Sequence, residues 1–165
     1  MNLSPFLNAK AFEKLDGLGL LLLRLWIAQE FVSAGVIKLS GGWHAPDWFA
    51  GLPFPLPVSL LPIDLNWLVA GLGEVTLGLC LAFGLFSRLA AAGLLFITWV
   101  AVYSVHFDLG WAGWNQIETE LGQGFKVPLM LAVMLSAILT QGGGRIALDA
   151  GLSRLRFFQP RIRTA

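Results

Sequence analysis

The stretch that decides the fold is Leu18 to Leu39, LGLLLLRLWIAQEFVSAGVIKL, an apolar run that carries Arg24, Glu30 and Lys38. A helix that crosses about 30 Å of hydrocarbon needs roughly 20 residues of this kind. The run therefore predicts a membrane-spanning helix. A charge near the bilayer centre costs from about 3 to more than about 10 kcal/mol. We therefore expect these three side chains to be paired or to line a polar cavity.

Three more apolar runs follow, and the four predicted spans are 18–39, 65–86, 89–107 and 125–140. Hydrophobic residues make up 56% of the chain and charged residues 13%, whereas soluble proteins have roughly 45–50% and 25%. A soluble helical bundle is therefore the weaker alternative. Because 165 residues suit one folding unit, we predict a single all-α membrane domain over 1–165, built as a bundle of four transmembrane helices.

The segments that connect the spans are rich in turn-forming and aromatic residues. Ser87 and Arg88 are expected to form a tight hairpin. The segment 40–66 has five prolines and no Lys or Arg, which favours an aromatic cap at the outer interface that is neither helix nor free coil. The Trp-rich segment 108–124 is similar. In the tail, 141–165, apolar residues alternate with arginines, and we expect a short amphipathic helix held by anionic lipid.

Most basic residues fall on one side of this four-span arrangement. The first apolar run is longer than a signal-peptide core, so we expect it to be retained as the first helix. Because cytoplasmic segments of membrane proteins carry an excess of Lys and Arg, both termini are predicted to be cytoplasmic. The basic residues on that side are Lys10, Lys14, Arg88, Arg145, Arg154, Arg156, Arg161 and Arg163.

Helical geometry groups the charges within the spans. Arg24 and Lys38 are fourteen residues apart, which returns them to within roughly 40° on one face of the first helix. Glu74 lies in the second span, which runs in the opposite direction. Glu74 and Glu30 are thus predicted about 13–14 Å below the outer surface, with Arg24 roughly 9 Å further toward the cytoplasm and within reach of both.

Two interpretations of these charges remain open. In the first, Arg24 pairs with Glu74 or Glu30 solely to hold the bundle together. In the second, Arg24, Glu30, Lys38 and Glu74 line a polar pocket for a proton, an ion, a quinone headgroup or another polar ligand. The second has support because three or four charges exceed what one structural pair requires.

His106 and Asp108 follow the third span and are candidates for the outer mouth of that pocket. His-x-Asp supplies only two ligands, which do not make a metal site, although His44 of the outer segment could add a third. We therefore predict no metal centre. The simpler alternative for His106 is an interfacial hydrogen-bonding role.

Several chemistries lack their motif. The single Cys80 excludes an internal disulfide and a CxxC redox pair. Neither Gly71-x-Gly73 nor the tract 142–145 (GGGR) completes a dinucleotide-binding or phosphate-binding loop. The net charge of +1 gives no indication of nucleic-acid binding. Since no motif encodes a cofactor, a quinone or a protein partner would have to carry electrons in any redox role.

Three patterns in the chain resemble those of the DoxX family, over roughly residues 18–152. The first span, LLLRLWIAQEFVSAGVIKL, has an early Arg and closes on Ala-Gly-x-x-Lys. The stretch GLGEVTLGLCLAFGLFSRLAA has a Gly-x-Glu segment followed by Gly-Leu-Phe-[Ser/Thr]-Arg, and GGGRIALDAGL is similar to the family's Gly-Arg-x-x-Leu-Asp ending. Glu30 and the Pro/Trp-rich outer segment fall outside the shared pattern. The matching positions are Arg24, Lys38, Glu74, Arg88, Arg145 and Asp149, the last three forming a structural motif.

The resemblance implies a bacterial four-helix inner-membrane protein linked with redox systems, such as a quinone-reducing thiosulfate oxidoreductase subunit or complexes with detoxifying enzymes. Our first hypothesis is therefore a redox-associated, quinone-facing subunit in contact with the lipid bilayer, with a protein partner in a redox complex or a second copy of itself. A small-solute or ion transporter and a membrane anchor for a soluble partner remain as alternatives. Whether the chain is itself catalytic stays open.

Overall fold

The computed structural model describes residues 16–154, and this part of the chain is mostly helical. Three of its helices are long and apolar enough to cross a membrane, and a fourth apolar helix is shorter. These three are α2 (Leu18–Ser40), α4 (Ile63–Phe83) and α5 (Ser87–Val105), and the shorter one is α6 (Lys126–Gln141).

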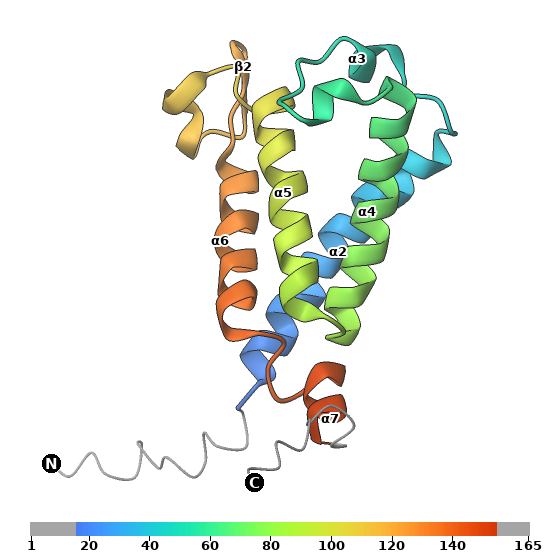
Figure 1. Ribbon diagram of the computed structural model, residues 1–165. Coiled ribbons are helices and arrows are strands. Elements are labelled where there is room, and N and C mark those ends of the chain that lie inside the picture. Colours follow the sequence, from blue (N-terminus) through green and yellow to red (C-terminus); the bar gives the residue numbers. More distant parts are fainter. Residues whose placement is uncertain (1–15, 155–165) are drawn as a thin grey trace, which may run out of the picture.

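The long helices form a bundle in which sequence neighbours run in opposite directions (Figure 1). Helices α4, α5 and α6 stand side by side, and α2 crosses obliquely behind them, packed mainly on α4. We call the end at which α2 begins and α6 finishes the tail end. The opposite end, where α3 (Asp47–Ala50) and the small β-hairpin lie, is the loop end.

The outside of the bundle is apolar and its interior holds charged groups. Trp26, Ile37 and Leu89 are 62–71% exposed, whereas Arg24 is 0% and Glu74 6% exposed. Soluble proteins show the reverse, because their large apolar side chains are mostly buried and their charges face water. The distribution suits contact between the bundle and lipid. The apolar core includes Ile27, Ala28, Phe31, Leu81, Leu94 and Leu135.

The turn between α4 and α5 begins earlier than predicted. It occupies residues 84–86, so Ser87 and Arg88 are the first residues of α5 rather than a hairpin. Gly84 ends α4 with a left-handed backbone (φ 68°), a conformation that glycine adopts without steric cost. The Gly-Leu-Phe that precedes Ser87 therefore makes the turn.

The two segments at the loop end contain short regular elements. The first carries the one-turn helix α3 and the 3-10 turn η1 (Val58–Leu60), so the expectation that it holds no helix was wrong by one turn. The second folds as η2 (Gly110–Asn115) and an antiparallel pair, β1 (Glu118–Thr119) with β2 (Gly122–Gln123). A two-residue pairing is too short to show as alternating hydrophobicity in a sequence.

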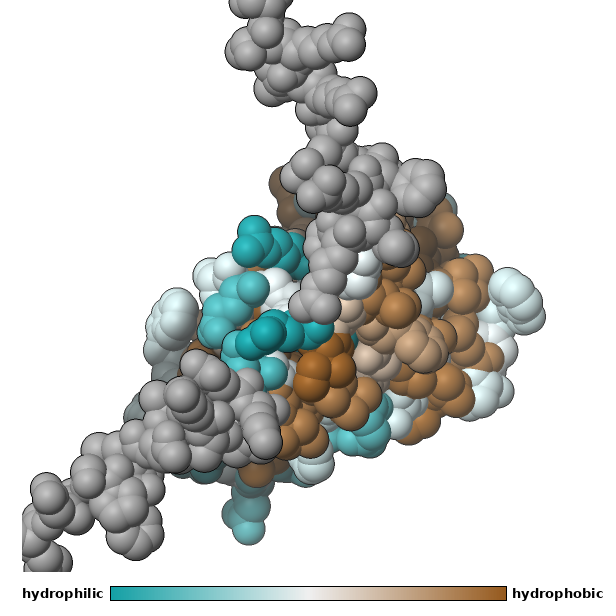
Figure 2. Space-filling model, turned by 90° about the horizontal axis from the view of Figure 1, so that it is seen from below, coloured by the Kyte–Doolittle hydropathy of each residue, from teal (hydrophilic) through white to brown (hydrophobic). Residues whose placement is uncertain are grey.

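At the tail end, helix α7 (Leu148–Arg154) follows the glycine tract. A helix thus lies within the predicted tail, while the apolar residues of that tail beyond Arg154 lie outside the described residues. Figure 2, which views this end, shows hydrophilic residues gathered in one area and hydrophobic residues over much of the rest. Arg145 donates to Asp16 at 2.9 Å in an exposed ion pair, which ties the start of α2 to the tail.

Candidate functional site

An ion pair between α2 and α4 is the centre of the candidate site. Lys38 Nζ lies 2.9 Å from Glu74 Oε1 and 2.8 Å from Oε2. The Glu74 side chain is 8% exposed and that of Lys38 is 23% exposed. Bringing a charge of each sign into one contact lowers the cost of holding either in a low-dielectric interior.

Glycines allow the two helices to approach closely enough for this pair. A Cβ on Gly35 would lie 2.8 Å from Val75 Cγ2, and one on Gly78 would lie 2.8 Å from Val32 Cγ2. Small residues at a helix interface let backbones come together in a membrane bundle. Gly35 and Gly78 both lie on the tail-end side of the Lys38–Glu74 contact along the α2–α4 interface.

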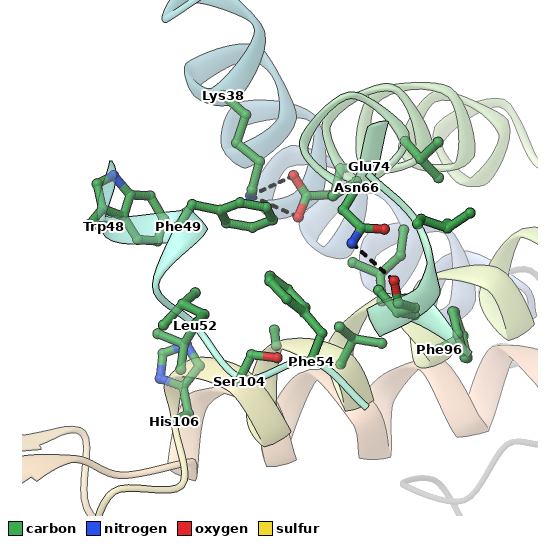
Figure 3. Close-up of a pocket in the computed structure, with 18 residues that line it drawn as sticks. Lys38, Trp48, Phe49, Leu52, Phe54, Asn66, Glu74, Phe96, Ser104 and His106 are labelled. Carbon is green, nitrogen blue, oxygen red and sulfur yellow. Dashed lines mark hydrogen bonds and ion pairs between the residues drawn. The ribbon is translucent and has the colours of Figure 1, made fainter. Parts of the chain in front are cut away.

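A cavity of about 370 Å³ lies between α2, α4, α5 and the loop-end segment that contains α3 (Figure 3). Lys38 and Glu74 form part of its wall, and Phe49 and Phe54 project toward its interior. Most of the lining is apolar. The other lining residues are Trp48, Leu52, Val58, Leu61, Asn66, Val69, Ala70, Phe96, Ile97, Val100, Ala101, Ser104, Val105 and His106.

Ser104 and His106 lie across the cavity from the ion pair (Figure 3). Ser104 Oγ and His106 Nδ1 are buried and have no hydrogen-bond partner among the described residues. Burial lowers the pKa of His106 below its usual value, although Gly124, Asp108 and Gln123 act in the opposite direction. The imidazole therefore stays neutral to lower pH than an exposed histidine.

Arg24 does not line this cavity, and it bonds neither Glu74 nor Glu30, so neither of the two open interpretations describes its contacts. Its guanidinium donates to the carbonyl oxygen of Leu81 at 3.1 Å and to that of Ile146 at 2.6 Å. Side chains in a helix tilt toward the helix N-terminus. Arg24 therefore extends toward the tail end, away from Glu74, and bonds the last turn of α4 to the chain before α7.

Two other residues proposed from the sequence lie outside the cavity. Glu30 is half-buried on α2, and within residues 16–154 its side chain makes no hydrogen bond or ion pair. Asp108 accepts a hydrogen bond from the Gln123 backbone N–H at 3.0 Å. Asp108 thus stabilises the β1–β2 hairpin and does not line the mouth of the cavity.

The three motif residues join segments at the tail end. Asp149 accepts hydrogen bonds from the Phe86 and Ser87 backbone N–H groups, both at 2.8 Å, and so caps the start of α5. Burial alone would raise the pKa of Asp149, but these bonds hold it below its usual value. Arg88 donates to the Thr140 carbonyl at 3.2 Å.

The remaining histidine lies apart from the cavity. His44 is paired with Asp64, at 3.1 Å between Nδ1 and Oδ2, at the exposed start of α4. It is therefore not placed as a third ligand beside His106 and Asp108. In the part of the chain that the structure describes, no group of three or more His, Cys, Asp or Glu side chains is arranged to hold a metal.

Sequence reasoning missed Ser104, Phe49 and Phe54 as site residues. The two phenylalanines lie in a proline-rich segment whose path has no periodic signal. A signal for Ser104 was available, because it lies two residues before His106, at the same end of α5.

Comparison with known proteins places the site within a recognised family region. The DoxX family model matches residues 19–107, which include Lys38, Glu74, Ser104 and His106. A protein of Haemophilus influenzae, described only as an uncharacterized protein, is 36% identical over 142 residues, which are 85% of this chain and 87% of that protein. No solved structure matches the chain.

Proposed function

This chain belongs to the DoxX family of membrane proteins, and we propose that its cavity binds the ring of a quinone in the service of a membrane redox system. One observation carries the proposal. An ion pair, Lys38 with Glu74, lies in the wall of a mainly apolar cavity that is lined in part by aromatic rings. Ligand sites of this kind combine a mainly hydrophobic lining with a few polar groups that fix orientation.

The chemistry of Lys38 suits a ring carbonyl. An ammonium group has three donors, and Glu74 takes two of them. Within the described residues no other acceptor is bonded to Lys38, so a third N–H is free to donate to a ligand oxygen. Phe49 and Phe54 supply faces and edges against which a flat ring packs.

The cavity also has a route of entry for an apolar ligand. Val69 of α4 and Phe96 of α5 line it and are 54% and 47% exposed, so it opens between these two helices. That surface is the one we assign to lipid. Toward the tail end the helices close, since a Cβ on Gly73 would lie 3.1 Å from Ile97 Cδ1.

In this proposal the protein spans the bacterial inner membrane four times, with both termini in the cytoplasm. Helix α6 has 16 residues, about 24 Å at 1.5 Å per residue, which is short but close to the hydrocarbon thickness. A fluorescent protein fused after Ala165 should then fluoresce, whereas periplasmic alkaline phosphatase fused there should stay inactive. The opposite pattern would reverse the topology.

Electrons must come from elsewhere, because the sequence holds no cofactor motif. A protein partner is therefore part of the proposal, with this chain holding the ring and the partner supplying the redox group. The transport alternative has less support. Arg24 and the Lys38–Glu74 pair belong to separate contacts, and between them lie the apolar core residues Ile27 and Phe31.

The test is binding of decylubiquinone to the full-length protein in lipid nanodiscs, measured by titration calorimetry with empty nanodiscs subtracted. We expect binding by the native chain and a loss of at least tenfold in affinity for Glu74→Gln and Lys38→Met. Glu30→Gln is the matched control, since it makes the same change in a membrane helix outside the cavity. Absence of binding to the native chain would refute the proposal.

A further inference from the structure

Ser104 differs from four other hydroxyl residues of the long helices. Thr76, Thr98, Ser136 and Thr140 each donate to the carbonyl four residues before them, at 2.7–2.9 Å. This internal bond is the usual way for a helical hydroxyl to be satisfied in an apolar setting. Ser104 Oγ makes no such bond, although the residue is only 8% exposed.

The unpaired hydroxyl has an unpaired neighbour on the same wall. His106 Nδ1 is also buried without a partner among the described residues, and both side chains line the cavity. Leaving one buried polar atom unpaired costs about 1–3 kcal/mol. Two such atoms on one cavity wall are therefore better explained by a ligand group than by packing.

The two polar walls face each other across aromatic side chains (Figure 3). Lys38 and Glu74 form the first, and Ser104 and His106 form the second. Asn66 is a further polar residue of the lining; its amide nitrogen donates to the Val58 carbonyl at 3.0 Å, and it lies beside Glu74, on the side of the first wall (Figure 3). The cavity thus offers free hydrogen-bonding atoms at two separate places with an apolar region between them.

We infer that Ser104 and His106 form a second polar subsite, so that the ligand is a flat ring with an oxygen at each of two opposite ends. One oxygen would meet Lys38, and the other would meet the Ser104 hydroxyl, with His106 Nδ1 beside it as an acceptor for a ring hydroxyl. This inference rests on the proposed function and narrows it to 1,4-substituted rings. The Ser104 hydroxyl can donate to a ring carbonyl or accept from a ring hydroxyl, so the subsite fits oxidised and reduced rings alike.

The test compares two probes that differ in the second oxygen, 1,4-naphthoquinone and 1-tetralone, on the full-length protein in nanodiscs. In the native chain the single carbonyl of 1-tetralone should take the charged donor Lys38, since hydrogen bonds to ionised groups are the stronger ones. Ser104→Ala should weaken the binding of 1,4-naphthoquinone by about two- to twelvefold and leave the binding of 1-tetralone unchanged. Ser136→Ala is the matched control, because Ser136 lies on α6 outside the cavity.

Infrared spectra of bound 1,4-naphthoquinone add a readout that a change in stability would not mimic. Both carbonyl bands should lie below the free-ligand frequency in the native protein. One band should return to the free frequency in Ser104→Ala, and the other should return in Lys38→Met. If both carbonyl bands keep their native frequencies in Ser104→Ala, the second subsite is wrong.

The binding outcomes separate the two proposals. If the native chain binds neither probe, the proposed function fails. If it binds both, and Ser104→Ala lowers the affinity for the two probes equally or not at all, the quinone site is supported and the second subsite is wrong. If Ser104→Ala lowers only the affinity for 1,4-naphthoquinone, the second subsite is supported.

Discussion

A Cβ atom on Gly35 of α2 would lie 2.6 Å from the carbonyl oxygen of Gly71 in α4. No side chain larger than hydrogen fits at Gly35 without moving one of these helices. The contact lies one turn from Lys38 in α2 and one turn from Glu74 in α4. The spacing of the two backbones therefore governs whether the ion pair forms.

Replacing Gly35 with alanine should destabilise the bundle. The added methyl group meets the backbone of α4, and overpacking of this kind costs about 1–3 kcal/mol. We expect a lower midpoint when the Gly35→Ala protein is unfolded by heat or SDS. Gly19→Ala in the same helix is the control, because a Cβ there meets no atom within 4 Å. Equal behaviour of the two variants would contradict the close contact.

Breaking the Lys38–Glu74 pair from one side should cost more than removing both charges. Lys38→Met leaves a buried carboxylate and Glu74→Gln leaves a buried ammonium, and removal of one partner of a buried pair costs about 3–5 kcal/mol. In the double variant neither charge is stranded. We expect its loss of unfolding free energy, measured by SDS titration, to be well below the sum of the single losses. Additive losses would show that the pair is not coupled.

Arg24 should matter for stability and not for ligand binding. Its guanidinium bonds carbonyl groups of α4 and of the segment before α7, and a lysine cannot reach all of them with one ammonium group. Arg24→Lys and Arg24→Met are expected to lower the unfolding midpoint, with the methionine variant lower. Where the variants remain folded, the dissociation constant for decylubiquinone should equal that of the native chain. A loss of decylubiquinone binding in folded Arg24 variants would show that Arg24 takes part in the ligand site.

Asp149 should stabilise the α4–α5 turn in a pH-dependent way. Its folded pKa is held below the usual 3.8, so its contribution is present above the unfolded value and is lost as pH falls through the folded value. Asp149→Asn should cost about 1–2 kcal/mol at neutral pH. The difference in unfolding free energy between Asp149→Asn and the native protein should become smaller when unfolding is measured below pH 4. Asp16→Asn, which removes an exposed ion pair, should cost at most about 1 kcal/mol.

The spans could be predicted because hydropathy is a local property. The predicted span 18–39 differs from α2 by one residue, and 65–86 differs from α4 by two or three residues at its ends. The second error has a definite cause. Leu85 and Phe86 are as apolar as the helix before them, but Gly84 has already ended it, and hydropathy does not distinguish an apolar turn from a helix.

The sequence grouped Lys38 and Glu74 with Arg24 and Glu30, and the structure pairs Lys38 with Glu74. Depth along the helices placed Arg24 and Glu74 within reach, but depth ignores the tilt of side chains toward the helix N-terminus. In antiparallel helices that tilt carries Lys38 and Glu74 toward each other and carries Arg24 away. With the tilt included, the same residues would have pointed to Lys38.

The sequence by itself determined that this is a membrane protein of long apolar helices with charges in its interior, because the energetic cost of a charge in lipid acts on each residue separately. The tertiary structure alone decided how those charges divide, with Arg24 at the tail end and Lys38 on Glu74 at the cavity. It also brought Ser104 and His106 across from that pair. These relations depend on helix rotation and glycine contacts between α2 and α4, which no single segment of the chain contains.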